Sequence, residues 1–256
     1  MAFHLTRAVG DGIRRILTRT GAVLFVGLLL LQFLVQISLN TAVVGLIPPE
    51  AADQVGSLGL TLPVSGTVGA VLFLVATLLS LPYFVGLSRA LTRPKNELST
   101  VPAELWRRRL GRASLSMLLG GFVVGISVWI GLLLFLLPGI FLGACFLCFI
   151  FAVGVEDRGT VGALRRSWGL SRGNRLKLSV IVIFSGVIGG IIGILGTVLD
   201  LAAVPVLAEL VTNTFGTVLF VFLYGMMAAS YLQLRDDTDD SEPETAASAD
   251  HGEESL

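Results

Sequence analysis

The chain has 256 residues, of which 54% are hydrophobic and only 14% are charged, and its mean hydropathy is +0.85. This composition excludes an ordinary soluble domain and indicates a membrane protein. The formal net charge of zero conceals an asymmetry, because nine carboxylates lie between Asp236 and Glu254 with no base among them. The rest of the chain is therefore basic.

Apolar runs that approach the length needed to cross a bilayer, about 20 residues, recur along the chain. In chain order we expect spans at residues 21–39, 66–88, 115–137, 139–155, 178–199 and 215–234. The fourth is short, but a tight turn at Pro138-Gly139 would let a tilted third span meet it, so that the two form a hairpin. We therefore predict an all-α polytopic bundle of six transmembrane helices in three hairpins, occupying residues 21–235 as one domain.

The basic residues predict the direction of the spans. All eighteen Lys and Arg fall into four groups, at residues 7–19, 89–112 and 158–177 and at Arg235. Every second connection between spans instead carries only acidic charges, from Glu50, Asp53, Asp200 and Glu209. Since basic residues concentrate on the cytoplasmic side, we expect a multi-pass protein of the plasma membrane with both termini in the cytoplasm.

The two ends of the chain differ in character. Residues 1–20 predict a cytoplasmic amphipathic segment whose Arg14, Arg15 and Arg19 reach lipid headgroups, although a simple positive flank fits equally well. The long apolar run after it favours an uncleaved anchor over a signal peptide. Residues 236–256 are acidic, lack aromatics and predict a disordered cytoplasmic tail. Sixteen Arg against two Lys, with this acidic end, are typical of a salt-loving archaeon.

The most specific stretch of sequence joins the fourth span to the loop after it. It contains Pro138-Gly139-Ile140, Glu156-Asp157-Arg158-Gly159, then ALRRSW at residues 163–168 and SRGN at residues 171–174. This stretch resembles the membrane domain attached to glycerophosphodiester phosphodiesterases and its stand-alone multi-pass relatives, and the likeness extends loosely over residues 13–235. The resemblance implies a membrane domain with no agreed activity of its own. The soluble phosphodiesterase domain is missing, so that activity is not carried over.

Four residues of this stretch are candidates for a structural network. Glu156 and Asp157 lie one or two turns from Arg165 and Arg166, and salt bridges between them would hold the loop helix against the bundle. Pro138 and Gly139, which form the predicted turn before the fourth span, are counted in the same structural network.

A second set of residues is a candidate surface for an anionic lipid or a protein partner: Arg165, Arg166, Trp168 and Arg172. Val161, Leu164 and Trp168 recur at helical spacing, so they predict an apolar stripe that enters the membrane interface or a groove. The simpler interpretation is a helix that only anchors the loop.

Few residues within the spans suggest chemistry. Gln32 and Gln36 share one helix face, as links between helices or, less favoured, as a path for substrate. Cys145 and Cys148 form a C-x-x-C motif, but membrane depth favours packing over redox or metal binding. His4 and His251 lie near the ends. We predict no enzyme, with no catalytic, cofactor or metal site, and no nucleic-acid partner.

Glycine spacing predicts close packing of helices. Four pairs have the small-x-x-x-small spacing that lets helix backbones approach: Gly121 with Gly125, Gly139 with Gly143, Gly186 with Gly190, and Gly189 with Gly193. The fifth span has the densest glycines. It is therefore expected either at the centre of the bundle or at the face of a homo-oligomer.

The expected function is a non-catalytic membrane domain that binds lipid or a partner through its basic cytoplasmic face. The alternative is a passive transporter, or permease-like protein, for lipid or a small solute. Asp200 and Glu209 are placed at or beyond the outer edge, and the absence of a deeper charge argues against ion-coupled transport. Residues 202–211 form either an interfacial helix or the start of the last span. A polar, water-accessible cavity joining Gln32, Gln36 and Asn40 to other polar side chains would favour an enzyme.

Overall fold

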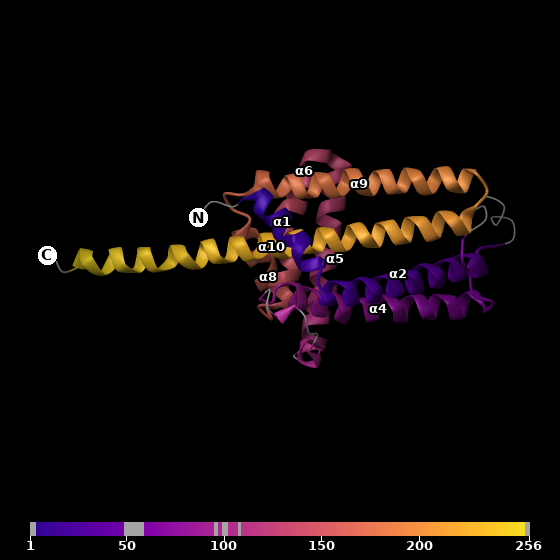
Figure 1. Ribbon diagram of the computed structural model, residues 1–256, viewed down its shortest axis with the longest axis horizontal. Helices are drawn as coiled ribbons and strands as arrows, with labels where there is room; N and C mark the ends of the chain where they lie inside the picture. Colours follow the sequence, from indigo (N-terminus) through magenta and orange to yellow (C-terminus); the bar gives the residue numbers. More distant parts are fainter. Residues whose placement is uncertain (1–3, 49–58, 95–96, 99–101, 107–108, 254–256) are drawn as a thin grey trace.

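A computed structural model describes residues 4–48, 59–94, 97–98, 102–106 and 109–253, the part beyond residue 237 by its backbone alone. These residues form helices and no strand. In chain order the helices are α1 (Leu5–Ile16), α2 (Arg19–Leu46), α4 (Gly66–Leu91), the 3-10 helix η2 (Ala103–Trp106), α5 (Leu110–Leu134), α6 (Leu136–Phe146), α7 (Phe149–Gly154), α8 (Thr160–Leu170), α9 (Arg175–Leu201) and α10 (Pro205–Glu253). Figure 1 shows them in place.

Six of these helical segments are long and apolar enough to cross a membrane. They are α2, α4, α5, α6 continued by α7, α9, and residues 205–237 of α10. Neighbouring segments pack in pairs, α2 with α4, α5 with α6, and α9 with α10. The all-α class and the three hairpins are therefore confirmed. The protein is a multi-pass membrane protein by the length and composition of these helices.

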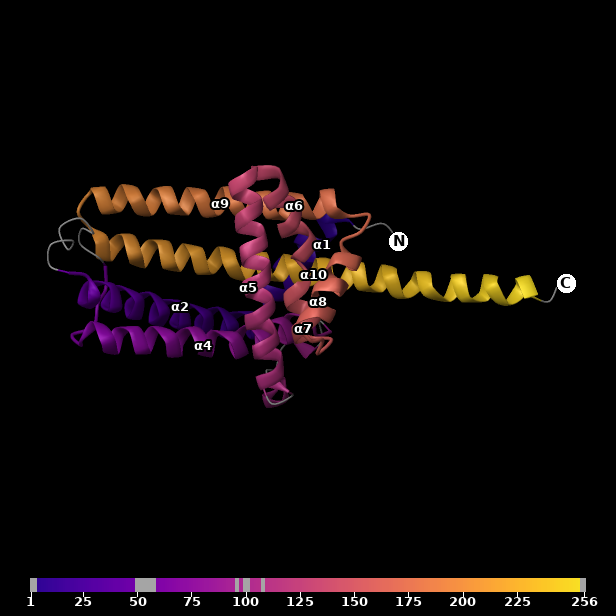
Figure 2. The same ribbon diagram turned by 180° about the vertical axis from the view of Figure 1, so that it is seen from behind.

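The middle hairpin has a different direction from the other two. Figure 2 shows α2, α4, α9 and α10 running along a common direction, while α5 crosses them near one end. The connection between α9 and α10 lies at the opposite end, as Figure 1 shows. Both ends of a hairpin lie on the same side of a membrane whether it passes through the lipid or lies along it. The distribution of arginines therefore cannot distinguish these two placements.

The turn of the middle hairpin lies earlier than the sequence predicted. Its one extended residue is Phe135, and Pro138 and Gly139 belong to the beginning of α6. Proline fits the first turn of a helix because the backbone N–H that it lacks has no partner there. Gly139 has a packing role instead, since a Cβ on Gly131 of α5 would lie 2.8 Å from the Gly139 Cα. Glycine at both positions allows the two backbones to touch.

The glycines of α9 do not make the close contacts that their spacing suggested. A Cβ at Gly186, Gly189, Gly190 or Gly193 would meet no atom within 4 Å, and the same holds for Gly121 and Gly125 of α5. The helix packs against α6 and α10 and lies at the side of the fold (Figure 1). A central position for α9 was therefore wrong. Small residues permit the close approach of another helix, but their spacing does not determine whether a helix packs there.

The last helix is longer than predicted at both ends. It begins at Pro205, so residues 205–211 are part of the sixth span and not a separate interfacial helix. Its backbone also continues to Glu253, through the acidic segment for which the sequence predicted disorder. Extending an existing helix requires no new nucleus, which makes continuation less costly than forming a separate helix.

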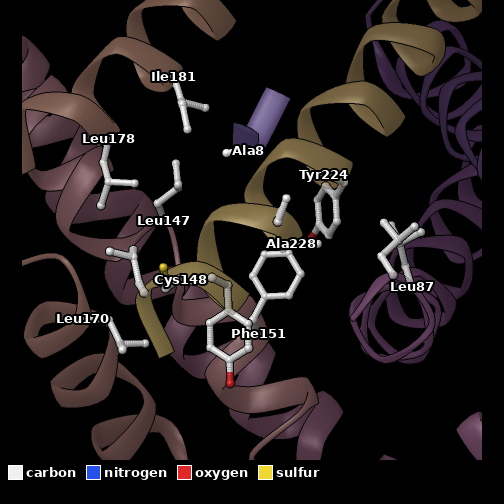
Figure 3. Close-up of a cluster of buried hydrophobic side chains, with 14 of the residues drawn as sticks. Ala8, Leu87, Leu147, Cys148, Phe151, Leu170, Leu178, Ile181, Tyr224 and Ala228 are labelled. Atoms are coloured by element: carbon white, nitrogen blue, oxygen red, sulfur yellow. The ribbon is translucent and has the colours of Figure 1, made fainter. Parts of the chain in front are cut away.

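One cluster of buried apolar side chains joins the loop helices to the spans. Figure 3 shows it, with Ala8 of α1, Leu87 of α4, Phe151 of α7, Leu178 of α9 and Tyr224 of α10 among its members. These side chains are at most 3% exposed. Helices α1, α7 and α8 are therefore fixed to the long helices by burial, which positions the charged groups that they carry.

The N-terminal helix is part of this core and does not only flank the first span. Helix α1 packs along α10, where a Cβ on Gly12 would lie 2.6 Å from the backbone nitrogen of Met226. Arg15 was expected to reach lipid headgroups, but it is 8% exposed. Its Nη1 donates hydrogen bonds of 2.7 Å to the carbonyl oxygens of Leu91 and Arg93. The expectation was wrong for Arg15 because the end of α4 supplies carbonyl acceptors, whereas Arg14 and Arg19 are not buried.

Candidate functional site

Glu156 is the centre of a charged network at the arginine-rich end of the protein. It follows α7, and its Oε1 accepts hydrogen bonds from Arg166 Nε at 3.1 Å and from the Tyr231 hydroxyl at 2.8 Å. Its Oε2 accepts a hydrogen bond from Arg158. Burial alone would raise the pKa of Glu156, but the hydrogen bonds from Tyr231, Arg158 and Arg166 outweigh it and lower the pKa. Glu156 therefore stays ionised and links α7, α8 and α10.

Asp157 belongs to a second pair that the sequence did not indicate. Its Oδ1 accepts a 2.9 Å hydrogen bond from Arg89 Nη2 at the end of α4, and the two side chains are 10% and 9% exposed. Arg89 also donates to the carbonyl oxygens of Gly154, at 2.6 Å, and Leu105, at 3.0 Å. Asp157 has a φ of 52°, a left-handed conformation that aspartate tolerates better than most residues. One guanidinium thus joins three segments of the chain.

The structure divides the four predicted contact residues of α8 and the turn after it into two groups. Arg166 is turned inward to Glu156. Trp168 packs against Phe141 and Phe146 of α6, and Arg175 lies over its ring at 4.4 Å from the centroid. Arg165 and Arg172, by contrast, are exposed. Arg166 and Trp168 therefore hold α8 in place, and only Arg165 and Arg172 are open to a ligand.

The accessible basic side chains come from several elements near the same end of the protein. Within the described part of the chain they are Arg7, Arg14, Arg19, Arg109, Arg112, Arg158, Arg165, Arg172 and Lys177. Several belong to the first turn of a span or immediately precede it, where the headgroups of a bilayer are located. We call this set the arginine face.

A separate polar group lies at the opposite end, where α2, α10 and the segment before α4 meet. Glu209 of α10 is 8% exposed. Its Oε2 accepts hydrogen bonds from Asn40 Nδ2 at 2.9 Å and from the backbone N–H of Leu60 at 2.7 Å. Asn40 also donates to the Leu60 carbonyl at 3.1 Å, and the hydroxyl of Thr41 accepts from the Leu62 N–H at 2.8 Å. These bonds fix residues 60–62 against the bundle.

Beside Glu209 is a pocket of about 200 Å³, which we call the outer pocket. Gln36, Asn40, Asp200 and Asn213 also line it. Gln32 does not line this pocket but a different groove of about 460 Å³ beside α9 and α10. The cavity that would favour an enzyme, with Gln32, Gln36 and Asn40 together, is therefore not formed. The outer pocket joins only Gln36 and Asn40 of these three, and its polar lining offers carboxylate, amide and hydroxyl oxygens. Such oxygens form the ligand set of a cation site.

Sequence reasoning did not identify Glu209 as a buried residue, because the sixth span was expected to begin ten residues later. The apolar character of residues 202–211 was the available signal. Glu50 and Asp53, the other acidic residues of the outer connections, lie outside the described residues.

The two cysteines lie in the core. Cys145 and Cys148 are buried and carry free thiols, and the carbonyl of Cys145 accepts a 2.9 Å hydrogen bond from the Ser167 hydroxyl. The described residues contain no group of three or more His, Cys, Asp or Glu side chains placed to hold a metal ion.

A comparison with models of protein families gives a match over most of the chain. The model of the DUF7847 family, a domain of unknown function, matches residues 3–234 and so extends from α1 into the membrane-spanning part of α10. No curated protein and no solved structure matches the chain. The match extends over most of the sequence, and the protein therefore belongs to the DUF7847 family.

Proposed function

We propose that this protein binds anionic lipid headgroups through its arginine face, as a non-catalytic membrane domain of the plasma membrane with cytoplasmic termini. The observation that supports this most directly is the orientation of α8. The pair of Glu156 and Arg166 and the packing of Trp168 hold the helix, while Arg165 and Arg172 remain exposed. A rigid helix and the turn after it, which together present two accessible guanidinium groups, are suited to bind phosphate.

Lipid fits this surface better than a soluble acidic protein. Several basic residues of the arginine face lie at the ends of helices that are long enough to cross a membrane, where the headgroups of a bilayer would be located. A guanidinium can donate two parallel hydrogen bonds to one phosphate. Each basic residue near an anionic membrane surface contributes about 1 kcal/mol to attraction. The resemblance to the phosphodiesterase-linked membrane domain remains a prediction and is not needed for this proposal.

Replacing both Arg165 and Arg172 with alanine should weaken the binding of an anionic lipid by roughly 10- to 30-fold, at about 1 kcal/mol for each lost charge. Thermal stability should change little, because both side chains are exposed. The measurement is a titration of the full-length protein in neutral detergent with short-chain phosphatidylglycerol, with short-chain phosphatidylcholine as the uncharged reference.

The matched control is Arg166→Ala, which removes an inward-facing arginine from the same helix. It should lower the midpoint of thermal unfolding and leave lipid affinity almost unchanged in the folded protein. Equal loss of lipid affinity in both variants would show that charge alone, and not the orientation of α8, controls binding. Unchanged affinity in the Arg165 and Arg172 double variant would reject the proposal.

The second candidate function is passive movement of lipid or a small solute. The groove of about 460 Å³ favours it, because Gln32, Ser185 and Thr217 place polar groups along an otherwise apolar path beside α9. If the groove conducts, vesicles that contain the protein should exchange labelled lipid or a neutral solute faster than empty vesicles. Replacing Gly189, which lines the groove, with leucine should then slow the exchange. No exchange above the empty vesicles would exclude this function.

A further inference from the structure

Glu209, which lines the outer pocket, has a carboxylate oxygen with no partner in the described part of the chain. While Oε2 of Glu209 accepts two hydrogen bonds, its Oε1 is shielded from solvent and has no hydrogen-bond partner there. Glu209 belongs to a helix segment long and apolar enough to cross a membrane. An ionised oxygen in such a position is costly unless a positive charge faces it.

The other polar side chains that line the outer pocket supply oxygens and no positive charge. Asp200, at the end of α9, is exposed, so the pocket reaches the surface of the protein. The Nε2 of Gln36 donates a 3.0 Å hydrogen bond to the Oδ1 of Asn40, which leaves the carbonyl oxygen of Gln36 as an acceptor. Asn213 adds another amide, and none of the described lining residues is basic. Ligands of this kind select hard cations.

We propose that the outer pocket binds one hard metal cation between Glu209 and Asp200, and that calcium is the ion it fits best. Two carboxylates balance the charge of a divalent ion. Calcium accepts an irregular shell of about 6–8 oxygens, including amides and water. At about 30 Å³ per water molecule, a pocket of about 200 Å³ has room for an ion that keeps part of its hydration.

The position of the site indicates what the cation does for the protein. Glu209 already holds Asn40 of α2 and the backbone of Leu60. A cation on its second oxygen would extend this link to Asp200 at the end of α9. Binding would therefore join α2, α9, α10 and the segment before α4 at the outer end, and it should stabilise the folded state. The affinity expected of a site with two carboxylates is in the range of weak extracellular calcium sites, roughly 10⁻⁴–10⁻³ M.

The experiment uses the full chain in nanodiscs of neutral lipid. Anionic lipid is left out because it would itself bind calcium and would also bind the arginine face. After treatment with a chelator, radioactive calcium should bind with a stoichiometry of one per chain over a constant excess of sodium chloride. Millimolar calcium should raise the midpoint of thermal unfolding by about 3–6 °C. Glu209→Gln and Asp200→Asn should each abolish most of both effects, whereas Asp236→Asn, at the cytoplasmic end, should retain them.

Three results would overturn the proposal. They are the absence of saturable calcium binding, full binding in Asp200→Asn, and an equal stabilisation by sodium alone. If Glu209→Gln does not fold, calcium binding to Asp200→Asn tests the proposal. This variant should fold, because Asp200 is exposed. The outcome does not depend on the arginine face, since anionic lipid is excluded from the assay.

Discussion

Replacing Arg89 with alanine should destabilise the folded protein strongly. The substitution leaves the buried carboxylate of Asp157 without its guanidinium and removes the donors to the Gly154 and Leu105 carbonyls. Breaking a buried ion pair by removing one partner costs about 3–5 kcal/mol. The midpoint of thermal unfolding in detergent should therefore fall by about 10 °C.

Conservative variants separate the contributions to this loss. Arg89→Lys keeps the charge but cannot reproduce the fork of donors, so it should retain part of the stability. Glu97→Gln removes an i,i+4 pair with Arg93 in which the Glu97 side chain is 50% exposed, and this control should have little effect. A small loss for Arg89→Ala, comparable with that of Glu97→Gln, would show that Arg89 does not hold α4, α7 and η2 together.

A cysteine at the tip of the middle hairpin should be inaccessible to reagents in the outer aqueous phase. If α2, α4, α9 and α10 cross the bilayer, the crossing direction of α5 places the hairpin along the membrane (Figure 2). Its tip is apolar and exposed on the protein, with Phe135 at 74% and Leu137 at 77%. Leu134→Cys should therefore be in hydrocarbon, where a thiol does not ionise and reacts poorly.

The measurement is labelling of intact cells with a membrane-impermeant maleimide, after Cys145 and Cys148 have been replaced by alanine. Thr61→Cys, in the segment before α4, should be labelled from outside, and Arg172→Cys only after permeabilisation. We expect the labelled fraction of Leu134→Cys to be roughly tenfold or more below that of Thr61→Cys. Labelling of Leu134→Cys from outside as strong as that of Thr61→Cys would show that the hairpin passes through the membrane.

Sequence reasoning was most successful where a property depends on neighbouring residues. The apolar runs predicted all six candidate spans, and the hairpin of the third and fourth was confirmed although its turn is at Phe135. Whether a single charged residue is turned inward or exposed was less predictable. Arg15 and Arg166 look like their neighbours Arg14 and Arg165 in the sequence, but each is held by acceptors from distant segments.

The helical class of the chain, the number of its apolar helices and the connections that carry its positive charges all follow from local composition, so the amino-acid sequence was sufficient to predict them. Three other features depend on residues far apart in the chain and became visible only in the folded molecule. The middle hairpin crosses the other helices, Arg89 pairs with Asp157 across 68 positions, and Glu209 is buried beside Asn40 across 169. Hydropathy gives each helix a preference for lipid but no partner. The partners are set by packing and hydrogen bonds between residues that become neighbours only when the chain folds.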